Sequence, residues 1–191
     1  MDSGGEASEP FAAVPHEEWL LRLNFNPEHI DNGKVVASAV SLTDLKTRGY
    51  SIDRERLIDV TIIAQRARDQ AANKPEKRQA PFLSKFECGP VRGEVDTDGR
   101  AAFLVEASPV AGNETQRANP AHAHVKSAIH RGDAGLRQLR ILLLPHLQRL
   151  IALGDYVRGA FNDDKVTPAA VSTQTDGAND VDPSPDTNAV G

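Results

Sequence analysis

The spacing of apolar residues changes twice along this chain, and this change limits the fold more than any other feature of the sequence. Apolar and polar residues alternate in residues 19–25 and 82–88, as they do in half-buried β-strands. Between these runs the apolar residues lie three or four positions apart, on one face of a helix: Leu57, Val60, Ala64, Ala67 and Ala71. This order of elements predicts an α+β fold, in which a small, mainly antiparallel sheet packs against one long helix and a Leu-rich C-terminal helical segment.

The same patterns place further strands and the limits of the helix. An alternating run at 34–42 predicts a strand that pairs with the first run as a hairpin with a long loop. Residues 101–107 predict a short strand, and residues 91–95 predict a shorter one before it. We expect the long helix to cover 54–72, with Asp53 as its N-cap.

Residues 134–158 are rich in leucine. Steps of three and four residues predict a helix through Leu136, Leu139, Leu143, Leu147, Leu150 and Leu153. Because Pro145 removes a helical hydrogen bond, we expect a kink or two helices there. Leu142, Leu144 and Ile151 lie off the main row. They are either buried on several sides or part of a surface for another protein or a second copy of the chain.

The net charge of −5 is concentrated at the two ends of the chain. Residues 163–191 carry six acidic residues and one lysine, and the first ten residues carry three acidic residues. The part between them is therefore mildly basic. We expect a flexible acidic segment at 1–10, a single α+β domain at 11–161 and a disordered acidic tail at 162–191, since the tail has too few apolar residues to form a core.

The composition also restricts the compartment. No apolar run reaches the length of about 18 residues that a membrane helix needs, and the acidic N-terminus lacks the regions of a secretory signal. Cys88 is the single cysteine, which excludes an internal disulfide and a multi-cysteine metal site. We expect a soluble, cytoplasmic protein in which Cys88 is a small buried hydrophobe rather than a nucleophile.

The candidates for catalysis are His29, Ser38 and His122. His29 and Ser38 fall on or beside neighbouring predicted strands, where they would line a nucleotide or NAD pocket or form an ordinary polar rim. His122 and His124 would share one face on a strand and diverge on a helix. Because Asn119 followed by proline is typical of a helix start, the helix is favoured and we predict neither a metal site nor a cofactor.

Basic residues gather between 66 and 92, where seven bases face three acids. The candidates for contact with phosphate or nucleic acid are Arg66, Arg68, Lys74, Lys77 and Arg78. Few aromatic residues accompany them, and no Gly-rich phosphate loop occurs in the sequence. The pattern favours a solvated helix end over a nucleic-acid surface.

Several short motifs together resemble a loose family of small bacterial proteins, for which no activity is established. Its pattern is a histidine, then S-A-F, then G-L-S-V-D-R, and later N-P-A-H-A. This sequence has His29, Ser38-Ala39-Val40, Gly49-Tyr50-Ser51-Ile52-Asp53-Arg54 and Asn119-Pro120-Ala121-His122-Ala123. Val40, Tyr50 and Ile52 depart from the pattern. The resemblance implies a bacterial origin and adds Asp53, Arg54 and Asn119 as candidate ligand-binding residues.

Three functions remain open, and the sequence does not decide whether the protein is an enzyme. The first is a non-enzymatic accessory or interaction component of a multi-protein system. The second is a small nucleotide- or NAD-handling enzyme or ligand-binding domain, with His29 and His122 in its pocket. The third is a nucleic-acid-binding module that uses the 66–92 segment. Convergence of the candidate residues in one pocket would favour the second function, and scatter would favour the first.

Overall fold

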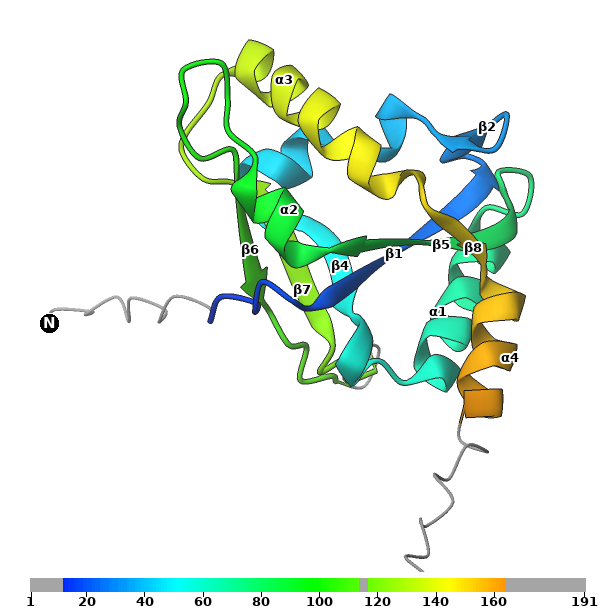
Figure 1. Cartoon of the computed structure of the whole chain (residues 1–191). Coiled ribbons are helices and arrows are strands. Elements are labelled where there is room, and N and C mark those ends of the chain that lie inside the picture. The colour runs from blue at the N-terminus through cyan, green and yellow to red at the C-terminus, as the bar shows by residue number, and fades with distance from the viewer. Residues whose placement is uncertain (1–11, 114–116, 164–191) are drawn as a thin grey trace, which may run out of the picture.

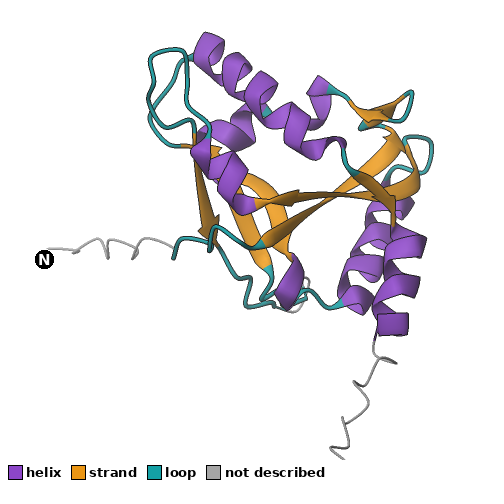
Figure 2. Cartoon of the chain, in the orientation of Figure 1, coloured by secondary structure: helices purple, strands orange, loops and turns teal. Residues whose placement is uncertain are grey.

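The computed structural model describes residues 12–113 and 117–163. Its centre is a six-stranded antiparallel sheet with the strand order β6-β7-β4-β1-β5-β8 (Figure 1). Helices lie on both sides of this sheet (Figure 2), so the α+β fold that the change in spacing predicts is confirmed. The acidic segment expected at 1–10, and the part of the expected acidic tail that follows residue 163, lie outside the described residues.

The sheet is built around one long antiparallel pair of central strands. Its strands are β1 (Trp19–Pro27), β4 (Tyr50–Arg54), β5 (Arg78–Glu87), β6 (Phe103–Ala107), β7 (His122–Ser127) and β8 (Leu150–Ala152). β1 pairs with β5 along its whole length and with β4 on its other edge. Because β1 is central, it is buried on both faces rather than on one, and even Asn24 is fully buried and hydrogen-bonds Ser84 at 2.8 Å.

The strand predicted over 34–42 is wrong. Only β3 (Lys34–Val35) forms there, and it pairs with β2 (Ile30–Asp31) in a separate two-stranded sheet. Asn32 and Gly33 both have positive φ, of 48° and 73°. This tight turn folds the segment back on β2, so it cannot become the partner of β1. A 3₁₀ turn at Ala37–Ala39 follows, and Ser38 is exposed on it.

The long helix starts later than the sequence predicts. α1 covers Val60–Asn73, and the side chain of Asp59 caps it by accepting from the Thr61 amide at 2.8 Å. Asp53 is therefore not the N-cap. It lies on β4, whose last residue falls within the predicted helix. A 3₁₀ turn at Glu55–Leu57 separates this strand from α1.

The strand predicted at 91–95 is also wrong, because α2 (Cys88–Gly93) covers most of it. Near Pro145 the Leu-rich segment breaks as expected: α3 (Asp133–Leu143) ends and a 3₁₀ turn begins. The chain then forms the edge strand β8 and the helix α4 (Leu153–Asp163). The buried leucines of this segment include Leu136, Leu139, Leu143 and Leu147.

Two apolar clusters lie on opposite faces of the sheet. One contains Tyr50 and Ile52 of β4, Val125 of β7 and the buried leucines of α3. The other joins Leu21, Leu23 and Phe25 of β1 to Ile63 of α1 and Leu153 of α4. α1 and α4 lie side by side and pack on β5 (Figure 1). Of the helices in the described part of the chain, none is long and apolar enough to cross a bilayer.

Candidate functional site

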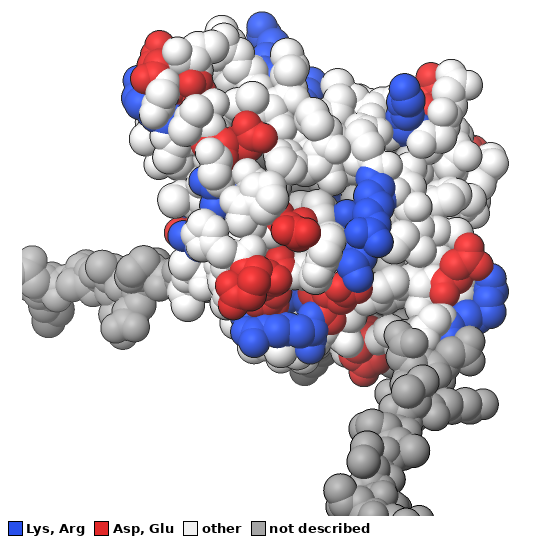
Figure 3. Space-filling view, in the orientation of Figure 1, with Lys and Arg blue, Asp and Glu red and all other residues white. Residues whose placement is uncertain are grey.

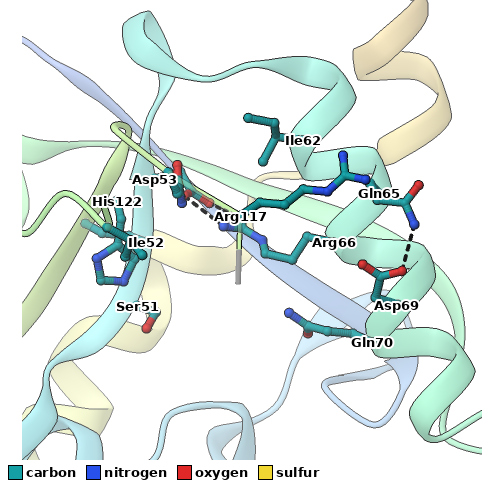
Figure 4. A pocket seen from close by; sticks show the side chains of 12 residues that line it. Ser51, Ile52, Asp53, Ile62, Gln65, Arg66, Asp69, Gln70, Arg117 and His122 are labelled. Carbon is teal, nitrogen blue, oxygen red and sulfur yellow. Dashed lines mark hydrogen bonds and ion pairs between the residues drawn. The ribbon is translucent and has the colours of Figure 1, made fainter. Parts of the chain in front are cut away.

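A cavity of about 480 Å³ lies where β4 and β7 meet α1. Volumes of this size are typical of small-molecule sites. The residues that line the cavity are Ser51, Ile52, Asp53, Ile62, Gln65, Arg66, Asp69, Gln70, Val110, Arg117, Asn119 and His122. Most of them are polar, and Figure 4 shows the side chains of β4 and α1 facing each other across the space.

Strand and helix periodicity explain why these side chains meet. In the β4–β7 ladder, Asp53 lies opposite His122, and Ser51 lies opposite His124. All four occupy one face, since their neighbours Tyr50, Ile52, Ala123 and Val125 belong to the core on the other face. From α1, positions 62, 65, 66, 69 and 70 contribute, which is the spacing of a single helical face.

A buried ion pair frames the cavity. The Asp53 carboxylate is only 2% exposed, and two nitrogens of the Arg66 guanidinium donate to its two oxygens, with Nη1 at 3.1 Å from Oδ1. The Asn119 amide donates to the same Oδ1 at 2.8 Å, and Asn119 Oδ1 accepts from the Ala121 amide. Bidentate geometry and full hydrogen bonding offset the cost of removing this carboxylate from water.

His122 has a defined tautomer beside this pair. Its Nδ1 lies 2.7 Å from the Ser108 carbonyl oxygen, which can only accept, so Nδ1 carries the hydrogen. When the ring is neutral, Nε2 is therefore a hydrogen-bond acceptor. The neighbouring His124 is nearly buried, and burial holds its pKa below the ordinary value. Its Nε2 lies 3.1 Å from Glu106.

The helix predicted around His122 and His124 is wrong, because both lie on β7. The Asn119 side chain does not cap a helix, since it bonds Asp53 and a turn amide, and the Asn119 backbone bridges to Val110. The two imidazoles consequently share a face. Within residues 12–113 and 117–163, no three potential metal ligands gather in one place.

Of the six candidate catalytic and ligand-binding residues, three converge and three do not. Asp53, Asn119 and His122 line the cavity. The other three candidates lie outside the cavity: His29, Ser38 and Arg54. Arg54 points to the opposite face of β4, where it forms two hydrogen bonds of 2.8 Å with Glu18.

His29 lies in the turn after β1. Its Nδ1 accepts from the Phe25 amide at 3.2 Å, and burial lowers the pKa of His29 to about 4. The ring is therefore neutral at neutral pH, and it contributes to the packing of this turn rather than to the cavity.

The basic segment does not form one surface. Arg66 lines the cavity, Arg68 donates to Gln65, and Lys77 is exposed. Lys74 and Arg78 bond Glu28, and the hydrogen bond from Arg78 is the main cause that lowers the pKa of Glu28 to about 2. Basic and acidic side chains are interspersed on the face seen in Figure 3, which does not favour a nucleic-acid surface.

Several lining residues are not among the sequence candidates. Ile62, Gln65, Asp69 and Gln70 could have been recognised by their helical spacing around Arg66, but only once β4 was known to face them. No sequence signal identifies Arg117, which comes from a loop. Cys88 is buried, and burial raises the pKa of its thiol to about 11, which agrees with the inert role expected for it.

In comparisons with known proteins, no family model, no curated protein and no solved structure matches the chain. The function is therefore inferred from the cavity and its chemistry.

Proposed function

We propose that this chain is a ligand-binding protein whose cavity between β4, β7 and α1 takes a small anionic molecule. The observation that carries the proposal is the convergence of Asp53, Arg66 and Asn119 in one hydrogen-bonded frame beside a second arginine, Arg117. A buried carboxylate is stable only when it is paired and hydrogen-bonded, and here its partners hold polar groups in place along the cavity wall.

The anionic class follows from Arg117. Asp53 neutralises Arg66, whereas no carboxylate in the described part of the chain lies within ion-pair distance of Arg117. A guanidinium has a planar set of donors that fits carboxylate and phosphate groups. In Figure 4, the Arg117 side chain extends across the cavity toward α1, where an entering anion would meet it.

The cavity argues against a nucleotide or NAD. Apart from the His122 ring, no aromatic side chain of the described residues lines it, so a base would find no stacking platform. Its apolar lining consists of Ile62 and Val110, since the Ile52 side chain packs in the core on the other face of β4. We therefore propose a smaller ligand, and we include the reducing cytoplasm in the proposal because the one cysteine is a buried free thiol.

Binding of simple anions tests the proposal. We expect phosphate, acetate and citrate to raise the melting temperature in proportion to their occupancy, and Arg117→Gln to weaken this binding about tenfold, since it removes a charged hydrogen-bond donor. Arg48→Gln is the matched control, because Arg48 is 77% exposed and bonds only Asp44 among the described residues. An unchanged wild-type melting temperature with all three anions would contradict the proposal.

A second candidate is the accessory or interaction component, which one observation favours. Ile141 on α3 is 67% exposed and Val95 is 52% exposed, and both line a shallow groove of about 300 Å³ together with Leu142. Exposed apolar residues that cluster in this way are common at protein interfaces. The proposed partner is a second copy of the chain.

A further inference from the structure

The charges that line the cavity do not all cancel in pairs. Four lining residues are charged: Asp53, Arg66, Asp69 and Arg117. Asp53 and Arg66 neutralise each other. The Asp69 carboxylate accepts a hydrogen bond of 2.7 Å from the neutral Gln65 amide and has no cation within ion-pair distance in residues 12–113 and 117–163. One cation and one anion, Arg117 and Asp69, therefore remain for a ligand.

We propose that the ligand is a small zwitterion of the α-amino acid class, with its carboxylate on Arg117 and its ammonium on Asp69. This inference rests on the proposed function: the ligand keeps the anionic group that binds Arg117 and adds a cationic group for Asp69. A ligand with only a negative charge would satisfy Arg117 but would be repelled by Asp69, whereas a zwitterion is attracted by both.

The arrangement of the two groups suits such a ligand. Figure 4 shows Arg117 and Asp69 on the same side of the cavity, with Arg117 reaching from its loop toward α1 and Asp69 lying on that helix beside Gln65. An arginine fork binds a carboxylate through two parallel hydrogen bonds. An ammonium donates three hydrogen bonds and finds acceptors in the Asp69 oxygens.

The rest of the lining has room for an amino-acid side chain. Ile62 and Val110 supply an apolar wall, and Ser51 and Gln70 supply neutral polar groups. The cavity of about 480 Å³ exceeds what the backbone of one amino acid needs. Pockets that combine an apolar wall with a few placed polar groups are typical of small-molecule sites.

Titration calorimetry with each standard amino acid, using the full chain, tests the inference. We expect at least one to bind with a dissociation constant below about 1 mM, the range of weak but specific ligands. The best ligand is then compared with its amide, which lacks the negative charge, and with its des-amino acid, which lacks the positive charge. Each analogue should bind at least about tenfold more weakly, because each loses one charged contact.

Two variants separate this inference from the proposed function. Asp69→Asn should weaken the amino acid about tenfold but strengthen the des-amino acid, because it removes an attraction in one case and a repulsion in the other. Arg117→Gln should weaken both. Asp155→Asn is the control, since Asp155 is exposed and pairs with Arg158 away from the cavity.

The outcomes are distinct. If simple anions bind but no amino acid does, or if the des-amino acid binds more tightly than its parent, the zwitterion inference is wrong and the proposed function stands. If Asp69→Asn strengthens both ligands, the ammonium contact does not exist. If neither anions nor amino acids bind, both proposals fail.

Discussion

Asp53 and Arg54 are neighbours in the sequence and each forms an ion pair, yet their side chains lie on opposite faces of β4. Asp53 faces α1 and holds Arg66 and Asn119, whereas Arg54 faces the other side of β4 and bonds Glu18. The alternation of a strand separates them. Because the sequence predicts Asp53 as a helix cap, it does not predict this separation, although it does indicate Asp53, Asn119 and His122 as candidate site residues.

His29 provides a prediction at the same scale. Burial lowers its pKa from 6.5 to about 4. Between these pH values, His29 is therefore protonated in the unfolded chain but neutral in the folded chain. The stabilising contribution of neutral His29 is complete above pH 6.5 and is lost as the pH falls from 6.5 toward 4. His29→Asn, which keeps an acceptor for the Phe25 amide, should flatten the fall in unfolding free energy over this window by about 1–3 kcal/mol.

Urea unfolding at a series of pH values measures this effect. His130→Asn is the control, since His130 is exposed and its replacement should leave the pH profile as in the wild type. Glu28 also stabilises the fold in a pH-dependent way, but its effect is lost at lower pH than that of His29. Because its pKa is about 2 instead of the ordinary 4.5, its contribution to the unfolding free energy disappears between pH 4.5 and 2. Identical profiles for wild type and His29→Asn would contradict the prediction.

Single elements could be predicted where the local pattern alone decides. β1, β5 and β6 coincide with alternating or apolar runs, and the break near Pro145 follows from proline chemistry. β4 and β7 could not be predicted in this way. Their segments contain residues that also suit helix starts, and only pairing between strands about 70 residues apart in the chain selects the extended form. The site lies on these two strands.

Gly49 tests how closely these elements approach each other. It precedes β4 with φ of 84°, and a Cβ placed there would lie 2.5 Å from the Cβ and Cγ of the buried His124 on β7. Gly49→Ala should cost about 1–2 kcal/mol for the left-handed backbone and about 1–3 kcal/mol more for the clash.

Gly99→Ala is the matched control. Gly99 also has positive φ, of 74°, but an added Cβ would meet no described atom within 4 Å. Gly99→Ala should therefore lower the unfolding free energy by only about 1–2 kcal/mol, the cost of the left-handed backbone conformation. Equal destabilisation by the two substitutions would show that β4 and β7 are less tightly joined at Gly49.

On the scale of the whole molecule, the site lies where a helical layer meets the polar part of a sheet face. α1 buries Ile63 and Ala67 against β1 and β5, while its adjoining face presents Arg66 and Gln70 to the cavity beside β4. One helix therefore supplies both core and site. The sequence could predict an α+β fold from its periodicities, but not which helix face would stand beside which strand, since that depends on sheet order.

Burial in the whole fold decides which residues of the Leu-rich segment can be replaced to test for an interface. Leu142 and Leu144, which lie off the main row of leucines, are partly buried against the core, and Ile151 pairs with Leu83 in the sheet. Acidic replacements at these positions would disturb the fold itself. Ile141 is the large apolar residue of α3 that is exposed, at 67%, so it is the appropriate position for the test.

Ile141→Asp should change the unfolding free energy by no more than about 0.5 kcal/mol, as is usual for exposed positions. Leu139→Asp is the contrasting variant, because Leu139 is fully buried and an unpaired charge there should cost more than about 3 kcal/mol. If a second copy of the chain covers the groove at Ile141, light scattering will give a dimer for the wild type and a folded monomer for Ile141→Asp. A wild-type monomer at every concentration measured would exclude self-association through this groove.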